Sequence, residues 1–384
     1  MLTWNVNEGF SEAVLRSLRM SFLKEEDYIA LKNTNNMVDF KMALETTDYE
    51  ELLVNQSSDI DIPKLKGILK QKLAQEINYI QTNTCEPLTE FLDLMRHGYW
   101  IDNIVNIIEG VKSKVDLDLL FKRNDPLGEF PEMKHVKVVE GEDYTDLYQT
   151  VLIDIPVGKY FHTFLEGLLA GDANRDASSI QNIMKEYKAE KIKNLLKKIW
   201  LTEFSKFCNL QLDGASKEIM NNLLKFESDC MTIQIIYNSI GNKELGGSAK
   251  GREAERKQYI HLEGFLYPGR DIELTQADDL NKLREAVRPF DIYRKMLENA
   301  PDPGKEEDFS NAPKTLDDIM FEEKAKQYAL AFEQQFHVAS YYAYLRLKEQ
   351  EIRNIVWLAE LVKLNIPKTQ PGWKKIIVPF KDIY

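Results

Sequence analysis

Apolar residues recur every three or four positions along most of this chain, which is the spacing of one face of an α-helix. The pattern runs through three consecutive pairs of long segments, at 62–83 and 87–113, at 177–208 and 214–241, and at 315–337 and 338–365. The alternation of apolar and polar residues that is typical of strands is scarce, and 136–139 is its best short example. The pattern therefore predicts an all-α protein.

Proline and glycine divide two of the three predicted pairs. Glu86-Pro87 lies inside the first pair and Leu212-Asp213-Gly214 lies inside the second, and both residue types end helices readily. Neither residue type interrupts 315–365, so one long or kinked helix remains an alternative there. Thr315 or Asp317 is expected to cap the helix that follows.

The three pairs also look like copies of one another. Asp146-Leu147 and Asp279-Leu280 each begin an amphipathic stretch that reaches a proline and then a tyrosine at matching separations, and a shorter version runs from Asp39 to Tyr49. The tyrosines are Tyr160 and Tyr293. Short motifs recur late in the pairs, namely Asn103-Ile104-Val105, Thr232-Ile233-Gln234 and Asn354-Ile355-Val356.

This similarity predicts three helical units, at 1–134, 135–260 and 261–384. The alternative is chance similarity among amphipathic helices. Loops are expected at 125–131, at 301–313 and at 241–259, where 241–251 looks like a flexible charged insertion. Gly241 and Gly246 have the spacing of a phosphate-binding loop, but the lysine of that motif is missing, so a surface linker is predicted.

A polar stripe at 348–357 interrupts the otherwise apolar pattern of the last helix. Glu349 and Arg353 have the i,i+4 spacing that lets an ion pair form along one helix face. Polar groups on an apolar helix must be hydrated, satisfied internally or used by a partner. The stripe is therefore a candidate either for bracing between the units or for partner contact.

Composition narrows the class of protein. The chain has 384 residues, 43% of them hydrophobic, and a formal charge of −12, so binding of nucleic acid over the whole surface is not expected. The lysines of 185–198 form a local basic face that is interpreted as a solvated helix surface. The three cysteines, which show no zinc spacing, fit a reducing cytosolic setting. No signal peptide or membrane-spanning run is expected.

Catalytic signatures are missing from the sequence. Asp93 with His97, and Glu333 with His337, lie at i,i+4 and suggest paired metal ligands, but the di-metal pattern needs Glu-x-x-His twice. Cys208 in an aromatic helix is interpreted as a buried apolar residue. No catalytic, cofactor-binding or metal site is predicted. A helical metal-dependent enzyme using His97 and His337 remains an alternative, as does a free-standing helical scaffold.

Specific strings near the C-terminus carry a resemblance to a known family. They are Lys348-Glu349-Gln350-Glu351, Arg353-Asn354-Ile355-Val356-Trp357 and Ala359-Glu360, with Gln335-Phe336-His337 before them. Further matches spread along the chain, including Thr47-Asp48-Tyr49, Glu86-Pro87-Leu88, Pro126-Leu127-Gly128, Lys206-Phe207-Cys208 and Leu266-Tyr267-Pro268. The chain thus resembles the family that contains V-type proton ATPase subunit d and its counterpart in archaeal-type ATPases. The loops 241–259 and 301–313 look longer than is usual in that family, and the tail at 373–375 looks more basic.

This resemblance implies an all-α fold of three similar V-shaped helical units, arranged with pseudo-threefold symmetry as a funnel. It implies a non-catalytic rotor subunit that couples the central stalk of the ATP-hydrolysing head to the proteolipid c-ring and so supports proton transport and organelle acidification. The implied partners are the c-ring and stalk subunits D and F, with subunit a as a further candidate and no nucleic acid. The implied location is the cytoplasmic face of vacuolar and endolysosomal membranes, reached through partner subunits only. Our candidates for partner contact are Glu349, Gln350, Arg353 and Asn354.

Overall fold

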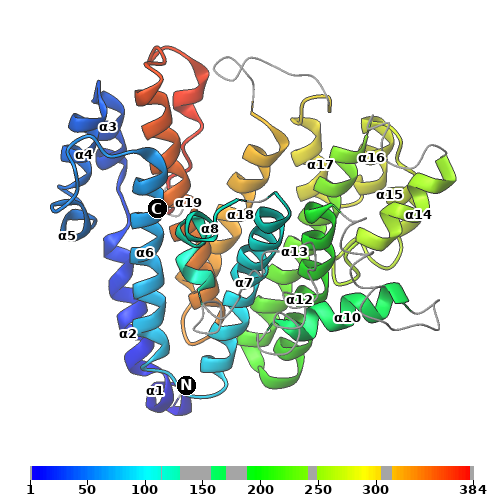
Figure 1. Ribbon diagram of the computed structural model, residues 1–384. Coiled ribbons are helices and arrows are strands. Elements are labelled where there is room, and N and C mark those ends of the chain that lie inside the picture. Colours follow the sequence, from blue (N-terminus) through cyan, green and yellow to red (C-terminus); the bar gives the residue numbers. More distant parts are fainter. Residues whose placement is uncertain are drawn as a thin grey trace. The chain divides into compact units, whose positions relative to one another are not determined.

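Figure 1 shows a computed structural model of the chain, which describes residues 2–113, 115–129, 157–169, 188–240, 249–303 and 314–380. Every regular element within these ranges is a helix, so the all-α prediction is confirmed. The strand candidate at 136–139, the beginning of the repeat at 146–156 and the segment 177–187 lie outside the described residues.

The long helices lie close to where the apolar periodicity predicts them. They are α6 (Ile62–Gln81), α7 (Leu88–Lys112), α12 (Ala189–Gln211), α13 (Gly214–Ser239), α18 (Leu316–Glu333) and α19 (Ala339–Lys363). Their ends follow from local chemistry. Pro63 occupies the first turn of α6, where its missing N–H costs nothing. Thr315, one of the two expected caps, accepts the Asp318 N–H at the start of α18.

A turn at 334–338 separates α18 from α19, so the alternative of one long helix across 315–365 is wrong. The turn contains Phe336 with φ 65°, a left-handed conformation that is uncommon for any residue other than glycine. Helix α2 (Gly9–Leu18) holds this conformation from outside. Glu12 accepts the Phe336 N–H at 3.2 Å, and Arg16 donates to the carbonyls of Phe332 and Gln334. Tertiary contacts therefore set the break.

The chain divides into two compact units. The first unit contains residues 1–92 and 208–384, and the second contains 93–207. The first unit also includes the short elements α1 (Leu2–Asn7), η1 (Arg19–Ser21), α3 (Glu25–Asn33), α4 (Met37–Leu44), α5 (Glu50–Leu53), α14 (Ala249–Tyr259), α15 (Asp271–Gln276), α16 (Leu280–Val287), α17 (Asp291–Glu298) and η4 (Pro371–Lys374). The second adds α8 (Leu117–Arg123), η2 (Pro126–Gly128) and α10 (Gly158–Leu169).

Helix α19 is the central element of the first unit. It packs against α18, α6, α4, α3, α13 and η4, so it is covered on nearly every side. Its buried positions include polar and charged residues as well as the aromatic run Tyr341-Tyr342-Ala343-Tyr344, which is fully buried. A helix that is buried over most of its circumference lies in the core of its unit. The polar stripe therefore belongs to the most enclosed helix of the unit.

A second apolar cluster of the first unit joins α13 to α15, α16 and α17. Helix α14, which borders it, overturns the expectation of a loop through 259. Arg256 of α14 is buried and donates to Ser239 Oγ at 2.9 Å and to the carbonyls of Thr275 and Ala277 at 2.9 and 2.6 Å. A guanidinium with several fixed acceptors can be buried, so this charged sequence packs as a helix.

The second unit is built around α7 and α12. Trp200 of α12 donates its indole N–H to the Leu94 carbonyl at 2.8 Å, and its ring covers Gly98. Lys193 and Lys197 both pair with Asp102, each at 2.9 Å. Part of the basic face expected at 185–198 therefore makes structural contacts within this unit.

Candidate functional site

The stripe at 348–357 places its charged and polar side chains on different sides of α19. Gln350 and Asn354 are buried, whereas the side chains of Glu349 and Arg353 keep 30% and 38% of their surface exposed. The four predicted partner-contact residues therefore do not share one surface. Two of them face the interior of the unit and two reach its exterior.

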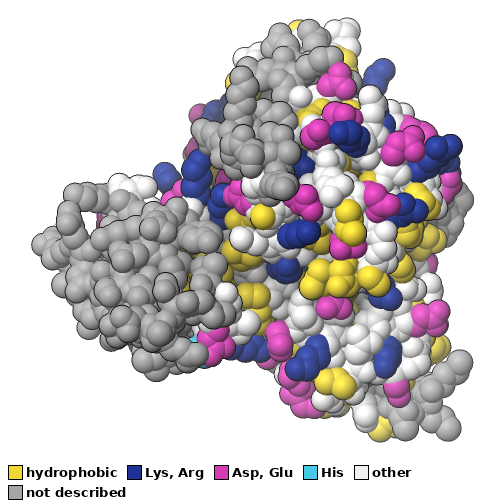
Figure 2. Space-filling model, turned by 90° about the vertical axis from the view of Figure 1, so that its right-hand side faces the viewer, with side chains coloured by type: hydrophobic (Ala, Val, Ile, Leu, Met, Phe, Trp, Pro, Cys, Tyr) yellow, Lys and Arg dark blue, Asp and Glu magenta, His cyan; other side chains and the backbone are white. Residues whose placement is uncertain are grey.

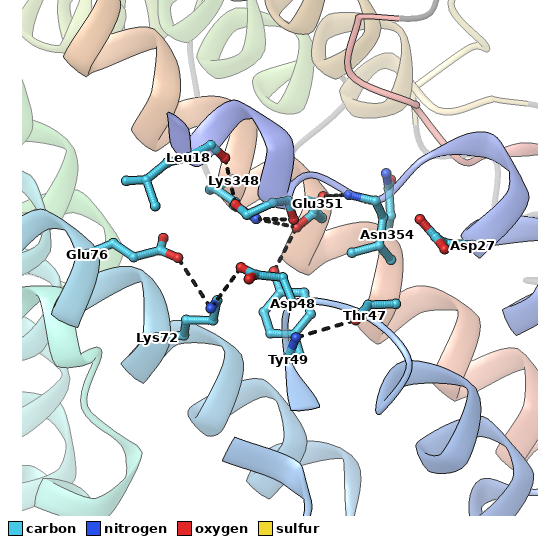
Figure 3. A network of polar contacts seen from close by, with 12 residues as sticks. Leu18, Asp27, Thr47, Asp48, Tyr49, Lys72, Glu76, Lys348, Glu351 and Asn354 are labelled. Atoms are coloured by element: carbon cyan, nitrogen blue, oxygen red, sulfur yellow. Dashed lines mark hydrogen bonds and ion pairs between the residues drawn. The ribbon is translucent and has the colours of Figure 1, made fainter. Parts of the chain in front are cut away.

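A buried ion pair between Lys348 and Glu351 lies at the centre of the stripe. The two side chains are 1% and 0% exposed, and Lys348 Nζ lies 2.8 Å from Glu351 Oε1. Glu351 also accepts the Tyr49 hydroxyl at 2.7 Å and the Leu23 N–H at 2.6 Å. Lys348 donates to the Ser21 carbonyl at 3.0 Å. The pair thus joins α19 to two points of the N-terminal segment (Figure 3).

The polar network continues from this pair onto α6. Lys72 pairs with Asp48 at 2.8 Å and lies 3.6 Å from Glu76. Figure 3 shows Lys72 between these two carboxylates. Glu76 also accepts the hydroxyl of Tyr344, one turn before Lys348 on α19, at 2.7 Å. Buried polar groups are tolerated when each one has a partner. These contacts hold the N-terminal segment, α6 and α19 in one arrangement.

Gln350 and Asn354 brace the C-terminal tail from the next turn of α19. Gln350 Nε2 donates to Asn354 Oδ1 at 2.9 Å. Asn354 donates to the Ile377 carbonyl at 2.6 Å, accepts the Ile377 N–H at 3.3 Å, and donates to the Tyr28 hydroxyl at 3.1 Å. Both side chains are satisfied within the chain, as the bracing alternative expects.

The ion pair suggested for Glu349 and Arg353 is not the one that forms. Arg353 pairs with Asp318 of α18 at 2.9 Å and stacks over the Phe321 ring, whose centroid is 3.6 Å from the guanidinium carbon. Glu349 pairs instead with Arg346 at 2.9 Å. The i,i+4 spacing permitted the predicted pair, but α18 supplies a better partner for Arg353.

A second buried carboxylate, Glu227 on α13, joins three helices. It accepts the hydroxyls of Tyr342, at 2.6 Å, and Tyr328, and Arg346 lies 3.6 Å away. Burial acts to raise the pKa of Glu227, but Arg346, Lys324 and the two hydroxyls outweigh it and hold the pKa below its usual value. Glu227 therefore stays ionised at neutral pH and fixes α13 against α18 and α19.

Asp229, half a turn further along α13, has a pKa that is shifted in the opposite direction. Its carboxylate accepts the Tyr293 hydroxyl at 2.7 Å and the N–H groups of Phe265 and Leu266 at 2.8 and 3.2 Å. Burial nevertheless raises the pKa of Asp229 to about 6, because the hydrogen bonds and Lys225 oppose the desolvation only in part. Asp229 is thus a buried acid that titrates near neutral pH.

We expect this shift to appear as a pH dependence of stability. A carboxyl whose pKa is higher in the folded than in the unfolded state stabilises the fold at low pH, and this contribution is lost as pH rises through about 6. Between about pH 5 and about pH 7.5, the free energy of unfolding should fall by about 1 kcal/mol more in the wild type than in Asp229→Asn. Urea unfolding at several pH values measures this difference. The exposed control Glu298→Gln should follow the wild type, and parallel curves for wild type and Asp229→Asn would refute the assignment.

Lys348 and Glu351 are absent from the four predicted contact residues, although both belong to the C-terminal strings. A signal for Glu351 was present in the sequence. It lies four residues after Leu347 and four before Ile355, so helical spacing places it on the apolar face. A charge at such a position must find a buried partner, and Lys348 is within reach.

One member of each histidine pair considered as metal ligands has another partner. His97 shares a hydrogen bond of 2.6 Å with the Tyr160 hydroxyl, and burial lowers its pKa to about 3. Glu333 pairs with Arg19 at 2.8 Å, while burial lowers the pKa of His337 to about 4. In the described ranges no three His, Cys, Asp or Glu side chains come together as a metal site would require. Cys208 is fully buried, as expected.

The side of the molecule shown in Figure 2 has no surface on which charges of one sign gather among the described residues. Lysine and arginine side chains alternate there with aspartate and glutamate across the described residues. Such interspersed charges do not create the positive field that attracts nucleic acid. Among the described helices, none is both long and apolar enough to cross a membrane.

Comparison with known proteins identifies relatives along nearly the whole chain. Residues 11–372 match the ATP synthase (C/AC39) subunit family. The chain is 34% identical to V-type proton ATPase subunit d of Dictyostelium discoideum, over 95% of this chain and 94% of the relative. It is 33% identical to V-type proton ATPase subunit d1 of Arabidopsis thaliana, over 95% of each chain. With V-type proton ATPase subunit d of Saccharomyces cerevisiae it shares 29% identity, over 94% of this chain and 95% of the relative.

Proposed function

We propose, from the premise that this chain belongs to the ATP synthase (C/AC39) subunit family, that it is a non-catalytic subunit of a V-type proton ATPase. The observation that carries the proposal is the match over residues 11–372 together with near full-length similarity to proteins named V-type proton ATPase subunit d. In this role it takes part in ATP-driven proton transport and organelle acidification without an active site of its own.

The finer role that we propose is that of a rotor coupler between the central stalk and the proteolipid c-ring. A part that transmits torque must be stiff, and close-packed helices with fixed polar contacts supply stiffness. The enclosed α19, its Lys348–Glu351 pair and the Glu227 centre support this role. The proposed partners are the c-ring and stalk subunits D and F, with subunit a as a further candidate. The proposed location is the cytoplasmic face of vacuolar and endolysosomal membranes.

The arrangement that we propose for this role is three V-shaped units, 1–134, 135–260 and 261–384, around a pseudo-threefold funnel. Within the stripe, Glu349 and Arg353 are the residues that contact a partner, because their side chains remain partly exposed. Gln350 and Asn354 contribute indirectly by fixing the tail beneath them. Charged groups at a partly exposed rim favour directional contacts with a partner.

Affinity purification of the tagged full-length chain from its native cells tests the proposal. We expect proteolipid and stalk subunits to co-purify with it. Recovery of the folded chain alone would favour the free-standing scaffold instead. A stoichiometric metal in the purified protein would favour the helical enzyme that uses His97 and His337.

Charge reversal at Arg353 tests the contact surface. Arg353→Glu should weaken co-purification of stalk subunits about tenfold or more, because a new carboxylate would stand where a partner meets a cation. The same substitution at the exposed Arg288, directly after α16, is the control and should leave co-purification unchanged. Circular dichroism and urea unfolding of the isolated chain show whether weaker co-purification comes from a lost contact or from a lost fold. If Arg353→Glu loses its fold, the residue braces α18 through Asp318, and the contact proposal fails.

A further inference from the structure

Three buried tyrosine hydroxyls make the same kind of contact in three parts of the chain. Tyr49 donates to Glu351 on α19 and Tyr293 donates to Asp229 on α13, both at 2.7 Å. Within the second unit, Tyr160 bonds His97 on α7 at 2.6 Å. All three tyrosines are at most 3% exposed, and they are the three that the sequence repeat aligns.

The two contacts of the first unit agree in further detail. Glu351 also accepts the N–H of Leu23, and Asp229 also accepts the N–H groups of Phe265 and Leu266. Each carboxylate therefore binds the backbone of a Phe-Leu pair, Phe22-Leu23 or Phe265-Leu266. The separation from the leucine to the tyrosine differs by only one residue between the two segments.

The helices between these contact points also correspond. Helices α3 and α4 lie between Leu23 and Tyr49, as α15 and α16 lie between Leu266 and Tyr293. The second helix of each set begins with a side-chain cap. Asn36 accepts the Asp39 N–H in α4, and Asp279 accepts the Lys282 N–H in α16. Similarity in both sequence position and contact argues against chance resemblance of amphipathic helices.

A second set of contacts involves the motifs that recur late in the long helices. Asn354 binds both the N–H and the carbonyl of Ile377, and Asn103 binds both the N–H and the carbonyl of Asp125, within their respective units. Thr232 accepts the His261 N–H at 3.1 Å. In all three cases the first residue of the motif binds backbone that follows its helix in the chain.

We infer that residues 21–53 form a clasp on α19, the second helix of the third pair, in the way that residues 264–293 form a clasp on α13. The N-terminal segment then contacts the last repeat of the chain through this clasp, in addition to α6 of the first pair, which it reaches through Asp48 and Lys72. The proposed first unit, 1–134, would begin after this clasp. The start of the chain thus packs against its last long helix. Each clasp unfolds locally as a separate unit, held by its own carboxylate, tyrosine and Phe-Leu backbone.

Hydrogen–deuterium exchange of the full-length chain tests this assignment with two matched substitutions. Tyr49→Phe removes one hydroxyl–carboxylate bond, so exchange should rise roughly tenfold or more in 21–53 and in the facing turns of α19, at 344–358. Exchange in 264–293 should stay unchanged. Tyr293→Phe should produce the mirror result, with faster exchange in 264–293 and none of this effect in 21–53. The exposed Tyr79→Phe should change neither segment.

Two results would overturn the inference. One is faster exchange in 21–53 of Tyr49→Phe without any change in 344–358. The other is an equal response of both clasps to either substitution, because that would make them a single opening unit. If Tyr49→Phe does not accumulate as folded protein, hydrogen exchange of the wild type in increasing urea tests the clasp instead. Residues 21–53 must then open together with 344–358, and opening together with 93–112 instead would refute the clasp.

Discussion

Replacing Glu351 by glutamine should lower the free energy of unfolding by about 3–5 kcal/mol, the usual cost of breaking a buried ion pair by removing one charge. Lys348 would keep its ammonium without a carboxylate beside it, surrounded by the Ser21 carbonyl, the Phe22 and Tyr49 rings and at most the neutral amide oxygen of the glutamine. The glutamine would also present an N–H₂ group to the Leu23 N–H or the Tyr49 hydroxyl, two groups that now donate to the carboxylate. Urea unfolding of the full-length chain measures the loss.

The matched control is Lys363→Met on the same helix. Lys363 pairs with Asp61 at 2.7 Å, but both side chains are more than half exposed, and such pairs contribute about 0–1 kcal/mol. The double substitution Lys348→Met with Glu351→Gln should recover part of the loss, since it removes the unpaired cation as well. If Glu351→Gln costs no more than Lys363→Met, the pair does not hold the N-terminal segment to α19.

The helices were predictable because they have a strong local signal. In α6 the buried Leu65, Ile68, Leu69 and Leu73 recur every three or four residues, a pattern that a helix places on one face and a strand does not. The same reasoning located α7, α13 and α19 to within a few residues of their ends. The tyrosines of the repeat were also visible in the sequence, although their acceptors on the long helices were not.

The failures have a common physical cause, which is dependence on residues far away in the chain. The turn before α19 exists because Glu12 and Arg16 of α2 bind its backbone. Helix α14 packs because Arg256 donates to acceptors on α13, in α15 and directly after α15. Arg353 pairs with Asp318 of α18 and not with Glu349, which is nearer in sequence. Local spacing limits which contacts can form, but the tertiary arrangement selects among them.

The second large effect is expected at Gly128, in the Pro126–Gly128 turn of the second unit. A Cβ at this position would lie 2.5 Å from the Tyr99 carbonyl oxygen and 2.5 Å from Asn103 Nδ2. The first of these atoms is α7 backbone, which cannot rotate away as a flexible side chain would. Gly128→Ala should therefore displace the turn and break the two hydrogen bonds between Asn103 and the backbone of Asp125. Leu127, now 1% exposed, would lose its burial with them.

We expect Gly128→Ala to cost about 3 kcal/mol, from overpacking together with the unsatisfied amide of Asn103. Gly67→Ala is the contrasting substitution, because Gly67 lies in α6 and a Cβ there would meet nothing within 4 Å. It should stabilise the chain by about 0.5–1 kcal/mol, the usual gain of alanine over glycine in a helix. Hydrogen exchange localises the damage of Gly128→Ala, which should be confined to peptides within 93–129 at low urea. Equal stability of the two variants would mean that the turn yields without resistance and that Asn103 does not fix it.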